Sequence, residues 1–182
     1  MMKRLSHLTR TSLLLGFLFA LDKVVAFFRS VIIARQFRLS TELDVFNVAN
    51  NLPDLLFALI SGGALAMAFI PLLSEYLTKK GYTAAWDLFS RVANLAFLVT
   101  ASLAVLIALF AEQIVRAEMG IAPGFGPAQQ NLVAELMRLN LIATLIFSIS
   151  GLVMAGLQAN QHFVLPAIAP LLYNVGQIFG AV

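Results

Sequence analysis

Long apolar runs constrain the fold of this chain more than any other feature of its sequence. A helix needs about 20 apolar residues to cross the hydrocarbon core of a bilayer. Runs of about that length are Leu13–Ile33, Leu55–Leu73, Val92–Ala111, Leu139–Leu157 and Phe163–Val182, and only the first of them contains charged residues. Charged residues make up 12% of the chain, against about 25% in a typical soluble domain. The sequence therefore excludes an ordinary soluble enzyme and predicts a membrane protein.

These runs also predict the class of fold. Backbone polar groups in lipid must bond to one another, so spanning segments are helices or closed barrels. Barrel strands alternate between apolar and polar residues over about 10 positions, and these runs do not alternate. We expect an all-α polytopic membrane protein with about five transmembrane helices, at residues 13–35, 44–76, 86–111, 131–157 and 163–182.

The remaining composition excludes several kinds of function. The net charge is +3, and the basic residues are scattered among apolar runs, so they form no footprint for a nucleic acid. The chain has no cysteine, its two histidines stand apart, and it contains no Gly-rich phosphate loop, paired carboxylates or nucleophile–base pattern. We expect no enzymatic activity, no metal or other cofactor and no nucleic-acid partner.

Basic clusters predict the orientation in the membrane. One cluster at residues 3–10 precedes the first span, and Lys79 with Lys80 follows the second. Two intervening spans place both clusters on one side, which the positive-inside rule makes cytoplasmic. The first apolar run resembles a signal peptide, but no small-residue cleavage site follows it and apolar character resumes at Val24. We therefore expect an uncleaved N-terminus in the cytoplasm.

Three charged residues lie inside the first span: Asp22, Lys23 and Arg29. Charges within a membrane are costly and usually face a bundle interior or a water-filled cavity. Asp22 and Arg29 are seven residues apart, so they share one face of a helix. We expect these side chains to line a polar cavity. Two alternatives stay open, namely that Arg29 extends toward the headgroups and that Asp22 and Lys23 form a neutral structural pair.

The second predicted span is long and contains helix-breaking residues. Residues 44–76 would extend about 50 Å as a helix, whereas the bilayer core is about 30 Å thick. Pro53 removes a helical N–H, beside the polar residues Asn51 and Asp54. Broken helices of this kind are typical of transporter sites, so we expect a gate or hinge here, with further bending at Gly62 and Gly63. One alternative is that the first half is an interfacial helix and Asn51 serves only as an N-cap. The other is close helix packing by the two glycines.

Several motifs together resemble a known family. They are the segments Ala26–Phe37, 44–56 and Gly63–Tyr76, followed by Val164–Pro170 with Asn174 after it. In this order and spacing they are similar to the MurJ/MviN lipid II flippases of the multidrug/oligosaccharidyl-lipid/polysaccharide exporter superfamily. The run AFIPLLSEY, which ends at Tyr76, is the most specific piece.

The resemblance implies a two-lobe transporter. It implies that residues 1–182 form part of the N-terminal lobe, that the C-terminal lobe is absent, and that the chain is inactive by itself. The implied function is to move the lipid-linked peptidoglycan precursor, lipid II, across the bacterial cytoplasmic (inner) membrane by alternating access. The implied partners are a lipid-linked saccharide diphosphate, held in a central cationic cavity, and membrane lipids.

The resemblance also assigns residues. Arg29 matches a cavity arginine of the family, and Lys23 falls where the family usually has another. With Asp22 beside them, they form the candidate substrate-binding set. An arginine suits a diphosphate because its guanidinium donates two parallel hydrogen bonds. Asp44 matches an acidic residue at the start of the second span, at the outer gate.

Departures from the family pattern leave alternatives open. Phe57 and Ala58 stand where the family tends to have two arginines, Gly62 replaces a glutamate, and Gln36–Arg38 replace a Phe-Gly turn. These changes are compatible with an exporter of another polyprenyl-linked saccharide or of a drug in the same superfamily. They are also compatible with a membrane scaffold that has lost transport.

Overall fold

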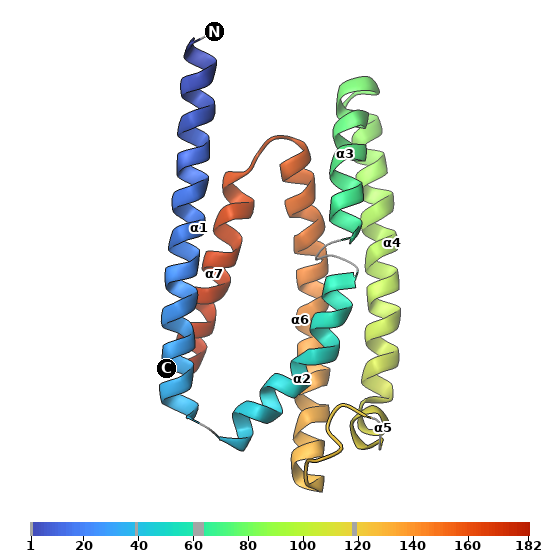
Figure 1. Cartoon of the computed structure of the whole chain (residues 1–182). Helices are drawn as coiled ribbons and strands as arrows, with labels where there is room; N and C mark the ends of the chain where they lie inside the picture. Colours follow the sequence, from blue (N-terminus) through green and yellow to red (C-terminus); the bar gives the residue numbers. More distant parts are fainter. Residues whose placement is uncertain (1, 39, 60–63, 118–119) are drawn as a thin grey trace. The chain divides into compact units, whose positions relative to one another are not determined.

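A computed structural model describes residues 2–38, 40–59, 64–117 and 120–182, and these residues form helices and no strand (Figure 1). The helices are α1 (Met2–Phe37), α2 (Thr41–Phe57), α3 (Ala64–Lys79), α4 (Tyr82–Leu109), α5 (Ala111–Arg116), α6 (Pro127–Ala159) and α7 (Val164–Ala181). The all-α class expected from the apolar runs is therefore confirmed.

Three helices of the described chain are long and apolar enough to cross a membrane. They are α4, α6 and α7, which overlap the stretches expected at 86–111, 131–157 and 163–182. The other two expected stretches overlap α1, which carries Asp22, Lys23 and Arg29, and the pair α2 and α3, which are shorter. With three such helices, the chain is a polytopic membrane protein.

The chain divides into two compact units. The first unit contains residues 1–39 and 161–182, and so holds α1 and α7. The second contains residues 40–160, and so holds α2 to α6.

In the first unit, α1 and α7 pack along each other (Figure 1). The side of α7 that becomes buried is formed by Pro166, Ala167 and Asn174. Phenylalanines such as Phe17 and Phe27 on α1 are exposed. Exposed aromatic side chains suit a helix whose outer face meets lipid, whereas Asp22 and Asn174 of the same unit are buried.

In the second unit, α6 is the central helix, and α2, α3, α4 and α5 all pack against it. Buried residues recur along α6 every three or four positions: Val133, Met137, Leu141, Thr144, Ser148, Leu152, Ala155 and Ala159. This spacing follows one stripe of the helix. The small residues toward the end of the stripe allow close approach of neighbouring helices, which is the usual basis of packing in membranes.

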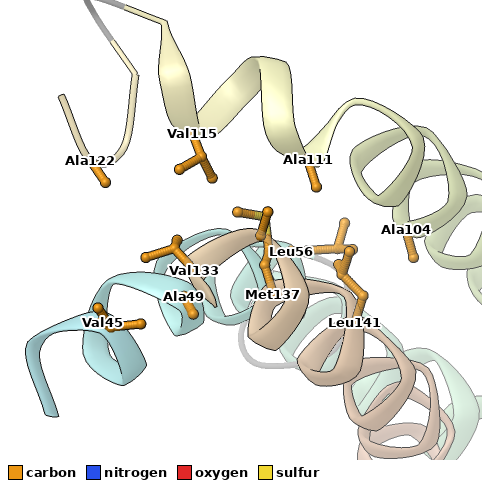
Figure 2. Close-up of a cluster of buried hydrophobic side chains, with 11 residues drawn as sticks. Val45, Ala49, Leu56, Ala104, Ala111, Val115, Ala122, Val133, Met137 and Leu141 are labelled. Atoms are coloured by element: carbon orange, nitrogen blue, oxygen red, sulfur yellow. The ribbon is translucent and has the colours of Figure 1, made fainter. Parts of the chain in front are cut away.

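Two hydrophobic clusters occupy the two ends of α6. In the first cluster, Met137 and Leu141 of α6 meet side chains of α2, α4 and α5 (Figure 2). These side chains are Val45, Ala49, Leu56, Ala104, Ala111 and Val115. The second cluster joins α3, α4 and α6 through Phe69, Leu73, Ala85, Ala96, Leu152, Ala155 and Ala159. Together they hold all five helices of the unit on one another.

The helix α2 begins at a conventional cap and runs through its proline. Ser40 is the N-cap, and its Oγ accepts a hydrogen bond from the backbone N–H of Leu43 at 3.3 Å. Asn51 lies inside α2, so the alternative that it serves as an N-cap is wrong. Pro53 is buried inside α2, and the helix continues to Phe57. Packing of the apolar face against α6 compensates for the one hydrogen bond that the proline removes.

Candidate functional site

Two of the charged residues on α1 turn toward α7. Asp22 is 5% exposed and Arg29 is half-buried, and they lie on one face of α1 because they are seven residues apart. Opposite them on α7 stands Asn174, which is 6% exposed. This pairing follows from the packing of α1 on α7 within the first unit.

A chain of hydrogen bonds joins these side chains. Asn174 Nδ2 donates to Asp22 Oδ1 at 2.7 Å. Arg29 Nη1 donates to Asn174 Oδ1 and to Gln177 Oε1, both at 2.7 Å. Gln177 Nε2 in turn donates to the hydroxyl of Tyr173 at 2.6 Å. We call Asp22, Arg29, Asn174 and Gln177 the polar bridge.

The polar bridge holds Arg29 without neutralising it. Both acceptors of its Nη1 are uncharged carboxamides, and no ion pair to Arg29 occurs in the part of the chain that the structure describes. Its Nε is buried and has no hydrogen-bond partner there. A buried donor without a partner often marks a site that is completed by a ligand, water or ion. The arrangement therefore presents a fixed cation suited to an anionic ligand.

Lys23 lies at the edge of the same site. Its Nζ is 3.5 Å from Asp22 Oδ2, while its side chain is 81% exposed. Such an exposed ion pair contributes at most about 1 kcal/mol. The ammonium is thus free to approach a ligand, and the charges of Asp22, Lys23 and Arg29 sum to one positive charge.

The structure adds two residues that the sequence argument does not assign to the site. Arg29 bonds to both of them on α7, which favours a role within the helix pair over an extension toward the headgroups. The sequence shows Asn174 and Gln177 as polar residues in the last apolar run but gives neither of them a role in the site. The available signal was two carboxamides three residues apart in an otherwise apolar helix, which places them on one face.

The candidate gate residues lie in the second unit, on α2. Asp44, Asn51 and Asp54 are exposed, and their spacing places them on one side of the helix. Pro53 lies on the other side, which is buried against α6. The expected hinge residues Gly62 and Gly63 lie outside the described residues. The structure therefore places these three polar side chains on an exposed side of α2, which also carries Leu55, opposite the side packed against α6.

The departure at Phe57 also has a structural meaning. The Phe57 ring meets Phe147 of α6 edge-on, with 6.4 Å between ring centroids. A position where the resemblance led us to expect an arginine therefore serves packing instead. Among the described residues, no group of three His, Asp or Glu side chains is placed to hold a metal ion.

Comparison with known proteins identifies the family. A sequence model described as "Lipid II flippase MurJ" matches residues 33–182 of this chain. The chain belongs to the MurJ family. It is a multi-pass membrane protein of the bacterial inner membrane, as its apolar helices and its MurJ relatives both indicate.

Individual MurJ relatives align over most of the chain. It is 32% identical over 164 residues to the lipid II flippase MurJ of Burkholderia cenocepacia, covering 89% of this chain and 31% of the relative. It is 29% identical to the probable lipid II flippase MurJ of Buchnera aphidicola subsp. Acyrthosiphon pisum, covering 89% of this chain and 32% of the relative. It is 27% identical to the probable lipid II flippase MurJ of Treponema pallidum, with 98% and 34% covered.

These alignments extend beyond the segment that the family model matches. They leave out about a tenth of the chain or less, so residues 22–29 lie within the aligned region. The chain spans about a third of the length of the curated relatives it matches. No solved structure matches it.

Proposed function

We propose that this chain forms part of a flippase that moves lipid II across the bacterial inner membrane by alternating access, with its N-terminus in the cytoplasm. The observation that carries the proposal is Arg29, a cation inside a helix pair whose hydrogen-bond acceptors are neutral. Membership of the MurJ family supports the choice of a lipid-linked diphosphate as the ligand. Since the chain spans about a third of its relatives, a complete transport cycle needs a further lobe.

In this proposal Arg29 and Lys23 bind the diphosphate. The planar guanidinium matches two phosphate oxygens, and the flexible lysine adds a second positive charge. The interaction is stronger than in water because the dielectric constant near a membrane helix is low. Asp22 anchors the site by accepting from Asn174.

The proposed gate is α2 together with its connection to α3. Asp44, Asn51 and Asp54 supply polar groups for a water-filled cavity on the exposed face of α2. Pro53 leaves one backbone carbonyl without its helical donor, and such a site lowers the cost of bending. Gly62 and Gly63, which lie outside the described residues, are included in the proposal as hinge positions because glycine has wide backbone freedom.

Complementation tests this function. The chain replaces the aligned 164 residues of the Burkholderia cenocepacia relative, and the chimera is expressed in cells depleted of their own lipid II flippase. We expect the chimera to support growth. Arg29→Ala should abolish it, because the diphosphate then loses its fixed cation.

Arg91→Ala is the matched control. Arg91 is exposed on α4 of the second unit and pairs with Asp87 at 3.0 Å. Growth with Arg91→Ala and none with Arg29→Ala, at equal amounts in the membrane, supports the proposal. Normal growth with Arg29→Ala contradicts it.

The packing of Phe57 favours a second candidate, a carrier of another polyprenyl-linked saccharide, since the two arginines expected at Phe57 and Ala58 are absent. This candidate predicts that the chimera fails to replace the lipid II flippase but restores export in a strain that lacks a different saccharide carrier. Failure in every such strain would instead indicate a non-transporting scaffold.

A further inference from the structure

Asn174 stands between the two opposite charges of the polar bridge. Its Nδ2 donates to Asp22 Oδ1 and its Oδ1 accepts from Arg29 Nη1, each at 2.7 Å. A carboxamide is the side-chain group that offers a donor on one end and an uncharged acceptor on the other. The side chain is nearly buried, so water does not replace either bond.

This placement prevents a direct ion pair. Asp22 and Arg29 share one face of α1, about 10 Å apart along its axis, and an arginine side chain is long enough to cover much of that distance. Opposite charges in a low-dielectric site attract strongly. A direct pair would satisfy both groups and would leave little positive charge for a ligand.

We propose that Asn174 is a positioning residue that insulates Arg29 from Asp22, holding the guanidinium through a neutral amide so that its charge remains available to a diphosphate. The inference rests on the proposed function for the identity of the ligand. Gln177, on the next turn of α7, supplies a second uncharged acceptor for the same Nη1.

An exchange of the two side chains separates this role from a structural one. In the double variant Asp22→Asn with Asn174→Asp, the same groups are present and the net charge is unchanged. The new amide at position 22 donates to the new carboxylate at position 174, which also accepts from Arg29. Every hydrogen bond of the original bridge has a counterpart, but Arg29 now contacts a carboxylate directly.

Binding of inorganic pyrophosphate to the purified chain in detergent micelles or nanodiscs reports the charge. We expect the original chain to bind pyrophosphate, and both Asn174→Asp and the double variant to bind at least about tenfold more weakly, the equivalent of about 1.4 kcal/mol. Asp22→Asn alone should bind more tightly, because it removes a carboxylate and leaves the amide on Arg29. This variant also removes the ion pair between Asp22 and Lys23, so its pyrophosphate affinity shows the effect of that loss.

Asn131→Asp is the matched control. Asn131 accepts a hydrogen bond from Arg116 Nη2 at 2.6 Å on the exposed surface of the second unit. The substitution therefore makes the same chemical change beside a different arginine. Its pyrophosphate affinity should equal that of the original chain. Circular dichroism and size-exclusion chromatography confirm that each variant keeps its helices and remains dispersed.

Gln177→Glu keeps the experiment decisive if the double variant does not fold. It places a carboxylate on Arg29 while the bond between Asn174 and Asp22 remains, and it should also weaken pyrophosphate binding about tenfold. Unchanged binding in the double variant, or in Gln177→Glu if that one is used, overturns the inference. So does a lack of pyrophosphate binding by the original chain.

The growth assay separates this inference from the proposed function. If cells with the chimera fail to grow but the variants bind pyrophosphate as expected, the insulating role of Asn174 is supported and lipid II is the wrong substrate. If the chimera grows and the double variant grows and binds equally well, the flippase proposal stands and the insulating role of Asn174 is wrong.

Discussion

The two units of this chain bury their polar side chains in different ways. In the second unit, the buried hydroxyls of Thr100 and Thr144 donate to carbonyl oxygens four residues earlier in their own helices. In the first unit, Asp22 and Asn174 bond across two helices. A hydroxyl that bonds within its own helix needs no partner helix, whereas the polar bridge exists only when α1 and α7 are packed.

The comparison indicates where the proposed ligand binds. The second unit, which contains the proposed gate on α2, is held together by two apolar clusters. Polar bonds between helices also occur there. Ser74 of α3 donates to the backbone of Ala159 at 3.0 Å, and the half-buried Arg138 of α6 donates to the backbone of Ala108 at 3.1 Å, but Arg138 is paired with the carboxylate of Glu112. The first unit instead buries a charged group and an amide group. Such groups are energetically unfavourable inside a membrane, and where they occur they usually serve a ligand or a transport pathway.

The largest effect on stability is expected at Met137, which is completely buried in the first cluster of the second unit (Figure 2). Met137→Ala should lower the free energy of unfolding by about 2–3 kcal/mol, because a cavity replaces packed atoms. In lipid this loss reflects packing more than transfer from water. Unfolding in detergent measures it, and pyrophosphate binding should be unchanged. A change in pyrophosphate binding would show that packing in the second unit also affects ligand binding.

A smaller effect on stability is expected at Asn174. Asn174→Leu leaves Asp22 Oδ1 without its donor and Arg29 without one of its acceptors, at a cost of about 1–2 kcal/mol. The same unfolding measurement tests it, with Leu172→Ala on the exposed side of α7 as the control. Equal effects of the two changes would mean that the polar bridge does not stabilise the helix pair.

The smallest effect is expected at Thr144. Thr144→Val removes a hydroxyl whose hydrogen bond, at 2.9 Å to Asn140, stays within α6, while the shape of the side chain is kept. The free energy of unfolding should change by about 0.5 kcal/mol or less, because the substitution removes the hydroxyl together with its hydrogen bond and leaves no unpaired hydroxyl behind. A loss as large as that of Asn174→Leu would contradict the distinction between polar bonds within one helix and bonds between helices.

Local features of the sequence predicted much of the fold. The apolar runs predicted an all-α membrane protein, because hydrophobicity and length are properties of a single segment. The spacing of Asp22 and Arg29 predicted a shared face for the same reason. The role of Asn51 was harder to predict, because the cap at Ser40 extends α2 past it.

The partner of the charged face could not be predicted locally. Asn174 follows Arg29 by 145 residues, and their hydrogen bond depends on how α7 packs against α1. Nothing in the sequence near Arg29 specifies which helix covers it. The continuity of α2 through Pro53 is a similar case, because packing against α6 outweighs the local cost of the proline.

Lipid II movement in proteoliposomes is the measurement that bears most directly on the assignment of Arg29. The chimera with the Burkholderia cenocepacia relative is reconstituted with labelled lipid II, and the fraction reaching the outer leaflet is followed over time. We predict movement with the chimera and with Arg91→Ala, and only the protein-free rate with Arg29→Ala. Equal rates for the chimera and Arg29→Ala would contradict the role of Arg29 in carrying the diphosphate.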